Sequence, residues 1–191
     1  MCFDNREYEN KEFITLIEKE KTFKDKIFEQ CVFRNCNFQK SKFLNCHFAD
    51  CSFETIDFSL CTFSGTNFTD NIFKSCKIRG VDWSDIGLSY SFSFEETMLD
   101  DSTFDGMKFK KNSFETCSMK NTFFNECDLT KTTFCYSNLE DAVFQGCFLL
   151  ETDFRHARNY SIDPDMNKLT KAKFSYPDVT GLLDRLDIEI C

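Results

Sequence analysis

Histidine, glycine and long apolar runs are scarce in this sequence of 191 residues. The six glycines form no glycine-rich loop of the kind that cradles phosphate groups. Nothing pairs either of the two histidines, His47 and His156, with a recognisable nucleophile, and no carboxylate pair stands out. We therefore expect no catalytic, cofactor-binding or metal-binding residues, and the protein is predicted not to be an enzyme.

No stretch approaches the roughly 18 apolar residues of a membrane span. The first residues, MCFDNREYENKEF, are charged and lack the apolar core of a signal peptide. Twelve cysteines would ordinarily suggest a secreted disulfide framework. Nine of them share one position of a repeat, however, where a free thiol packs as a small apolar group. We therefore expect a reduced, cytoplasmic protein with no membrane association.

Phenylalanine is abundant and recurs at every fifth position. The central residues of 27 five-residue units can be followed along the chain, and 19 of the 25 phenylalanines occupy them. The centres run from Phe23 to Leu88 and, after one additional residue, from Phe94 to Phe154. A period of five fits neither a helix nor one continuous strand, so it indicates a repeat architecture.

The residue two places before each centre is usually small or apolar. Residues two apart on an extended segment point the same way, so each unit presents one large and one small residue inward and then turns. One unit cannot bury its own phenylalanine, and stacking of neighbouring units must create the core. The small position holds nine cysteines: Cys31, Cys36, Cys46, Cys51, Cys61, Cys76, Cys117, Cys127 and Cys147. Cys31 and Cys51, like Cys127 and Cys147, are twenty residues apart, which also admits a disulfide or a bridged metal, although packing explains them as well.

The units CNFQK (36–40), CSFET (51–55), CDLTK (127–131) and SNLED (137–141) resemble the A-(D/N)-L-x-x motif of the pentapeptide-repeat family. The resemblance covers roughly residues 20–158. It implies an all-β fold, a right-handed quadrilateral β-helix with four units per coil. We expect an N-terminal cap over 1–20, the repeat solenoid over 21–158 with a corner bulge near 89–91, and a C-terminal extension over 159–191. Qnr-type relatives carry larger loops than this one-residue break.

The C-terminal extension changes period. Pro177 and Asp178 suit the first turn of a helix, and apolar residues then follow at helical spacing. The sequence predicts a short amphipathic α-helix here. In gyrase-targeting members of the family the C-terminal end forms a symmetric dimer, so the resemblance implies a homodimer through this helix. The alternative is that the apolar stripe caps its own last coil. The expected interface residues are Val179, Leu182, Leu183, Leu186 and Ile188.

The net charge of −9 is unevenly distributed. Residues 21–88 carry +1, whereas residues 89–158 carry −5. Arranging the later units four to a coil gathers the acidic residues on two adjacent faces, and these are the expected partner-binding residues: Glu95, Glu96, Asp100, Asp101, Glu115, Glu140, Asp141 and Asp153. The face with Lys108, Lys110, Lys111 and Lys131 is basic.

A rigid acidic rod suggests DNA mimicry, because DNA-binding proteins meet closely spaced phosphates with a basic groove. The same charge argues against direct binding of nucleic acid. Resemblance to the Qnr-type group implies binding to DNA gyrase or topoisomerase IV, with altered supercoiling and protection from quinolones or peptide toxins. One alternative is an interaction scaffold with no topoisomerase role. Another is an enzyme or metal protein that uses the cysteines.

Overall fold

The chain is described by a computed structural model that covers residues 3–88, 90–184, 186 and 188–189. It divides into two compact units, residues 1–99 and 100–191. Each unit is a parallel β-solenoid in which a residue pairs with the residue twenty positions later. The predicted all-β solenoid is therefore confirmed.

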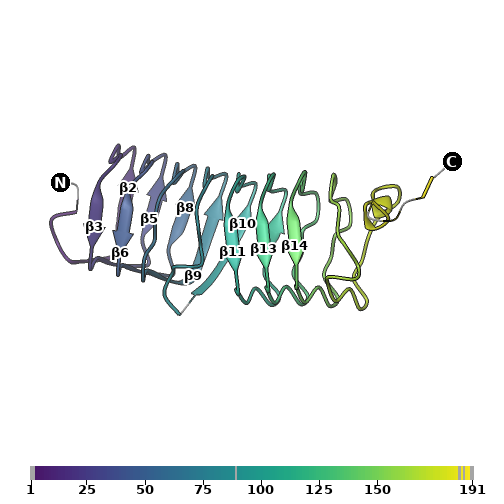
Figure 1. The fold of residues 1–191 in the computed structure, drawn as a ribbon. Coiled ribbons are helices and arrows are strands. Elements are labelled where there is room, and N and C mark those ends of the chain that lie inside the picture. Colours follow the sequence, from purple (N-terminus) through teal and green to yellow (C-terminus); the bar gives the residue numbers. More distant parts are fainter. Residues whose placement is uncertain (1–2, 89, 185, 187, 190–191) are drawn as a thin grey trace. The chain divides into compact units, whose positions relative to one another are not determined.

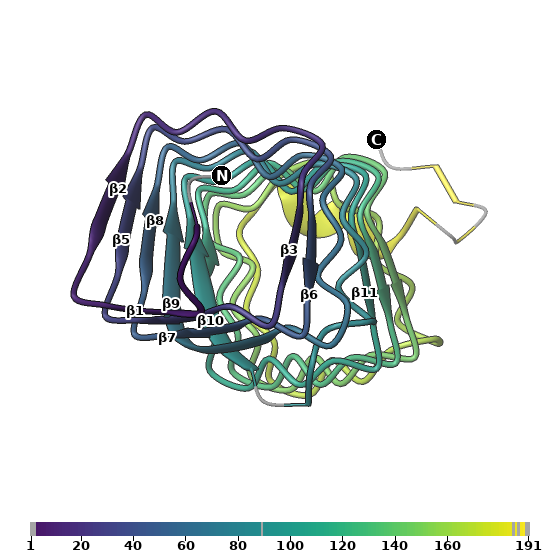
Figure 2. The ribbon, with the colours of Figure 1, turned by 90° about the vertical axis from the view of Figure 1, so that its left-hand side faces the viewer.

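The first unit contains ten strands. The order β1-β4-β7-β9-β8-β5-β2 makes one continuous sheet, in which the long β9 pairs with both β7 and β8, and β10 adds to β9. Strands β2, β5 and β8 lie side by side, as do β3 and β6 (Figures 1 and 2). The strands are β1 (Glu7–Glu9), β2 (Glu12–Ile14), β3 (Thr22–Lys24), β4 (Ile27–Glu29), β5 (Val32–Arg34), β6 (Lys42–Leu44), β7 (His47–Ala49), β8 (Ser52–Glu54), β9 (Asn67–Lys74) and β10 (Tyr90–Glu95).

The second unit contains β11 (Thr103–Asp105), β12 (Phe114–Glu115), β13 (Phe123–Asn125), β14 (Val143–Gln145) and the 3₁₀ helix η1 (Asp178–Leu182). Strands β11, β13 and β14 form a three-stranded sheet (Figure 1). Isolated bridges such as Ser118↔Asn138 keep the other faces in the same register. We name the four faces of this unit after central residues: the Phe114 face, the Met119 face, the Phe124 face and the Leu129 face.

Inward-facing rings form columns through each unit. In the first unit, Phe53 stacks between Phe33 and Phe73 with ring centroids 5.0 and 4.7 Å away. It meets Phe58 of its own coil edge to face at 5.5 Å. Both arrangements are favourable for aromatic pairs. The nine cysteines at the small position are buried, and the ten cysteines that the structure describes are free thiols. Their thiols donate hydrogen bonds to backbone carbonyls, as Cys61 does to Phe38 at 2.9 Å.

Most corners of each unit place a residue in the left-handed region. The φ values at these non-glycine corners lie near those of Asn10 (52°), Thr55 (57°) and Tyr136 (63°). Glycine occupies only four such corners, Gly65, Gly80, Gly106 and Gly146. The left-handed conformation costs most residues about 1–2 kcal/mol. The stacked core and the backbone hydrogen bonds between coils must therefore hold these corners in place.

The extra residue of the repeat changes the pairing of β10 with β9. The register shifts between Tyr90 and Phe92, so that Glu95 lies opposite Lys74 rather than opposite Ser75. The expected bulge included Ser89, which lies outside the described residues.

Residues outside the predicted repeat take part in both units. In the first unit, Phe3 is buried with edge-to-face contacts to Phe13, Phe23 and Phe28, and β1 and β2 already follow the twenty-residue register. In the second unit, the bridge Asp153↔Lys173 extends the register beyond residue 158, where the repeat was expected to end.

The prediction of a C-terminal α-helix is wrong. Residues 178–182 form one 3₁₀ turn, in which Thr180 donates to the carbonyl of Pro177 at 3.1 Å. Gly181 lies against the carbonyl of Tyr160, and its own carbonyl accepts a hydrogen bond from Ile162 at 3.1 Å. The Gly181 carbonyl therefore accepts a hydrogen bond from the last coil and does not continue a helical hydrogen-bond pattern.

Candidate partner-binding surface

The predicted acidic residues fall in both units, and several are engaged with neighbours. In the first unit, Glu95 forms an ion pair with Lys74 at 3.0 Å, and Glu96 accepts a hydrogen bond from Ser75 at 2.9 Å. In the second unit, Asp100 is only 6% exposed and accepts hydrogen bonds from the Ser118 hydroxyl at 2.6 Å and from the backbone of Lys120 at 3.0 Å. Asp100 is therefore a structural residue rather than a contact for a partner.

The Met119 face retains a moderate negative charge. Asp101 accepts a hydrogen bond from Asn121 at 3.1 Å, and Glu140 pairs with Lys120 at 2.5 Å. The ammonium group of Lys120 lowers the pKa of Glu140. Asp141 is exposed. With Arg158 placed in this column by its bridge to Asn138, the face carries four acidic and two basic residues.

Within the second unit, the Phe114 face carries two acidic and two basic residues, whereas the predicted acidity of this column also counted Glu95 and Glu96 of the first unit. Asp153 pairs with Arg155 at 2.7 Å and with Lys173 at 3.8 Å. The Arg155 guanidinium lowers the pKa of Asp153 to about 2. Glu115 is exposed on β12, and the structure gives it no ion pair among the described residues. Sequence reasoning ended the column at residue 156 and so left out Lys173.

The Phe124 face is the most uniformly acidic part of the second unit, and sequence reasoning missed it. The units around Phe104, Phe124 and Phe144 and the following loop, residues 162–166, contain no lysine, arginine or histidine. Gly146 donates to the carbonyl of Met166 at 3.1 Å, which fixes the loop to this face. The acidic residues are Asp105, Glu126, Asp163 and Asp165. Two of these four residues, Asp163 and Asp165, lie in the loop, beyond the last unit that the five-residue period identifies.

An exposed apolar pair lies within this acidic face. Phe123 of β13 is 51% exposed and lies opposite the half-buried Val143 of β14. Next to the pair, Asp141 and Asp163 line a cavity of about 280 Å³, together with Ala142, Phe144 and Ser161.

The Leu129 face has the opposite charge. Six lysines and two acidic residues give it a net charge of +4. Lys110 pairs with Asp128 at 3.0 Å, and Lys131 with Glu151 at 3.5 Å. Phe148 is 43% exposed here, with the Lys168 ammonium 4.7 Å from its ring centroid. The lysines are Lys108, Lys110, Lys111, Lys131, Lys168 and Lys171.

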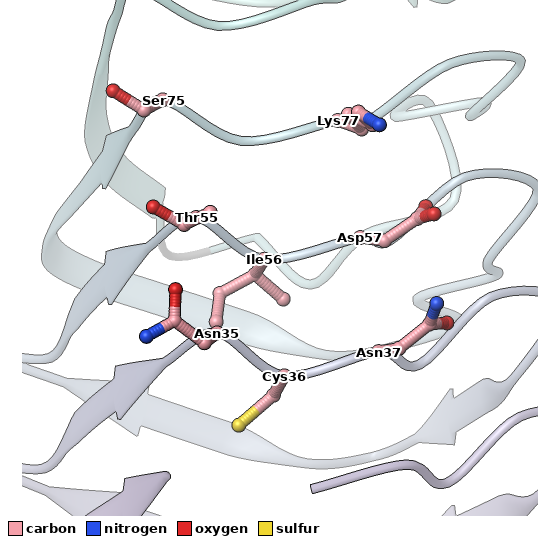
Figure 3. A pocket seen from close by; sticks show the side chains of 8 residues that line it. All are labelled: Asn35, Cys36, Asn37, Thr55, Ile56, Asp57, Ser75 and Lys77. Atoms are coloured by element: carbon pink, nitrogen blue, oxygen red, sulfur yellow. The ribbon is translucent and has the colours of Figure 1, made fainter. Parts of the chain in front are cut away.

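A further cavity of about 280 Å³ lies along one corner of the first unit (Figure 3). Its side chains stand in rows from successive coils, with Asn35, Thr55 and Ser75 on one side and Asn37, Asp57 and Lys77 on the other (Figure 3). Asp57 accepts a hydrogen bond from the backbone of Ser59 at 2.9 Å. This is a polar surface groove, in which no nucleophile faces a general base.

The histidines and cysteines form no reactive centre within the described ranges. His156 stacks on Tyr136 with centroids 4.8 Å apart. Burial raises the pKa of Cys51, Cys61 and Cys76 to about 12, which keeps their thiols protonated and unreactive. No group of three potential ligands that could hold a metal ion is found among the residues described. None of the described helices is long and apolar enough to cross a membrane.

The expected dimer residues differ in their exposure. Val179 and Leu182 are half-buried, whereas Leu183, Leu186 and Ile188 are 37%, 54% and 55% exposed. Part of the stripe covers the last coil of its own chain, and the remainder is accessible.

Two family models match the chain. "Pentapeptide repeat region" matches residues 26–104, and "Pentapeptide repeats (8 copies)" matches residues 124–158, so that more than half of the chain is covered. No curated protein matches. Among solved structures, a trypsin-treated form of QnrB1, a plasmid-mediated fluoroquinolone resistance protein, is 18% identical with a TM-score of 0.48, and covers 94% of this chain and 100% of its own.

HetL from the cyanobacterium Nostoc sp. strain PCC 7120, which is involved in heterocyst differentiation regulation, is 11% identical with a TM-score of 0.36. That match covers 90% of this chain and 88% of HetL. At these identities and scores, the solved structures carry no argument about function.

Proposed function

The chain belongs to the pentapeptide-repeat family, and we propose that it is a non-catalytic binding protein that mimics DNA and occupies the DNA-binding surface of DNA gyrase or topoisomerase IV. Binding there alters supercoiling and relieves poisoning by quinolones or peptide toxins. The observation that carries this proposal is the separation of charge in the second unit, which leaves the Phe124 face with four carboxylates and no cation.

The acidic faces supply a repeated negative field. Alternate coils bring carboxylates such as Asp101 and Asp141 onto one face, and paired strands lie about 4.8 Å apart, so these two charges lie roughly 10 Å apart along the face. Duplex DNA likewise presents a dense row of negative charge, and proteins that bind it do so with basic grooves. A basic groove attracts the acidic faces for the same reason, and the attraction weakens with salt.

We further propose a homodimer through the C-terminal extension. The exposed side chains of Leu183, Leu186 and Ile188 support it, because accessible apolar groups gain free energy when a second copy covers them. Light scattering on the purified protein tests this point. Substituting Leu186 and Ile188 with serine should give a monomer, and a wild-type monomer at micromolar concentration would contradict the proposed dimer.

The basic Leu129 face favours a second candidate function, an interaction scaffold with no topoisomerase role. Six lysines around an exposed phenylalanine are unnecessary for DNA mimicry and suit an acidic partner.

A supercoiling assay with purified DNA gyrase, with and without ciprofloxacin, separates the two candidates. The proposal expects the protein to change supercoiling or to restore it in the presence of the drug. It fails if the protein neither binds gyrase nor changes its activity under either condition.

A further inference from the structure

The exposed surface of the sheet β11–β13–β14 combines an apolar centre with an acidic rim. Its centre is Phe123 with Val143, and the charged residues of the same face are all carboxylates. Asp105 is held in place by the Asn125 amide at 2.7 Å. Phe123 is a half-exposed phenyl ring, and its burial against a partner is favourable.

We infer that this sheet surface is the site at which the partner docks, and that the partner presents a basic protein surface with an apolar recess for Phe123. The inference rests on the proposed function and adds the contact residues and the partner's chemistry. Charge complementarity selects this occupant. Four carboxylates without a cation repel nucleic acid and acidic proteins, and they attract lysine and arginine. Phe123 provides the kind of apolar anchor on which affinity in protein interfaces depends.

The cavity beside the apolar pair suits one cationic side chain of that partner. Its volume of about 280 Å³ corresponds to roughly nine water molecules. The carboxylates of Asp141 and Asp163 stand at its margin, and Ala142, Val143 and Phe144 line it with apolar groups. An arginine fits this combination, since its stem packs on apolar atoms while its planar guanidinium meets carboxylates. Phe123 and this cavity therefore give the partner two anchors that DNA itself does not offer.

The chain provides matched controls for both parts of this surface. Phe148 is an exposed phenylalanine at the equivalent position of its own repeat unit, but it lies on the basic Leu129 face. Glu151 is an exposed glutamate at the equivalent corner of a unit on the Leu129 face, so Glu151→Lys alters the net charge by the same amount as Glu126→Lys. Each test variant therefore carries the same substitution as its control and differs from it only in the face on which that substitution lies. All four side chains are exposed, and the variants are expected to unfold at the temperature of the wild type.

Binding of the variants to immobilised DNA gyrase tests the inference. Phe123→Ser and Glu126→Lys should each weaken binding about tenfold, whereas Phe148→Ser and Glu151→Lys should stay within about twofold of wild type. If all four variants bind as wild type does, or if the test and control variants weaken equally, the docking site is not this sheet, although the proposed function stands.

If wild-type protein binds neither gyrase nor topoisomerase IV, the proposed function fails, and an arginine-rich peptide with one central leucine becomes the probe. The same order of affinities among the four variants then supports the docking surface. Equal loss on Phe148→Ser and Phe123→Ser, or loss on neither, overturns it.

Discussion

Along one column of the first unit, charges of opposite sign alternate from coil to coil, whereas in the second unit whole faces differ in sign. Arg34 bridges Glu12 at 2.6 Å and Glu54 at 2.8 Å, and Lys74 continues the column to Glu95. In the second unit, the charged residues of the Phe124 face are all acidic, and those of the Leu129 face are mostly basic. The same twenty-residue register underlies both, so the repeat itself does not determine the charge pattern.

The cores differ as well. Phenylalanine occupies every centre from Phe23 to Phe73 in the first unit, with cysteine at five of the eleven small positions. In the second unit, Met119, Leu129, Leu139 and Leu149 alternate with phenylalanines, and Ser137, Thr122, Thr132 and Thr152 replace most of the cysteines. The first unit thus combines continuous aromatic columns with locally neutralised charge. The second leaves its charge unbalanced face by face, which is what recognition of a charged partner requires.

The largest expected effect tests the aromatic columns. Phe53→Ala in the first unit should lower the free energy of unfolding by about 4–5 kcal/mol, because the ring is fully buried between two stacked neighbours. Leu129→Ala, the matched change in the second unit, should cost about 3 kcal/mol. Urea denaturation followed by circular dichroism measures both. Equal losses would show that the aromatic columns add nothing beyond apolar burial.

A smaller effect should be the same in both units, because it concerns the corners they share. Thr55 and Thr116 are β-branched residues with φ of 57° and 56°. Asparagine tolerates the left-handed region better than a β-branched residue does, so Thr55→Asn and Thr116→Asn should each stabilise the protein by about 0.5–1 kcal/mol.

The reverse change Asn35→Thr, at the neighbouring corner of the same column, is the control and should destabilise by a similar amount. Thermal unfolding of the three variants measures these effects. Unchanged melting temperatures would mean that the stacked coils impose no strain at the corners.

An effect of similar size concerns pH and is specific to the second unit. Arg155 lowers the pKa of Asp153 to about 2 in the folded protein, below its value of about 3.9 in an unfolded chain. The stabilisation is therefore complete above about pH 4 and is lost as the pH falls toward 2. Asp153→Asn should remove about 1 kcal/mol at neutral pH and flatten the decline of stability between pH 4 and 2.

Glu115→Gln, on the same face, is the control for this titration, because Glu115 has no ion pair among the described residues. Urea midpoints measured from pH 2 to 7 follow both variants. A decline in Asp153→Asn as steep as that of wild type would show that the Arg155 ion pair does not contribute.

The sequence predicted the inward half of this molecule well, because burial dictates it. A five-residue period of phenylalanine, with cysteine two places earlier, leaves one arrangement that buries both, and the structure buries Phe53 and Cys51 accordingly. The acidic faces were predicted less well. Lys173 and Asp163 lie beyond the last recognised unit. The ion pair of Lys173 with Asp153 places Lys173 on its face, and the cavity that Asp163 lines together with Asp141 places Asp163.

The C-terminal prediction failed for a different reason. The spacing of Val179, Leu182 and Leu186 is helical, but helical periodicity does not reveal that Gly181 meets the backbone of Tyr160. Likewise, the burial of Asp100 depends on Ser118 and Lys120 of the next coil, so its sequence position alone suggested an accessible carboxylate. Tertiary contacts decided both cases.

Displacement of DNA from the enzyme tests the central claim most directly. Labelled duplex DNA bound to DNA gyrase is titrated with the protein, and fluorescence anisotropy reports the fraction of DNA that remains bound. A DNA mimic should release the DNA completely at saturation, with an apparent affinity that falls as salt is raised. Simultaneous binding of DNA and protein, or displacement that does not depend on salt, would contradict the account.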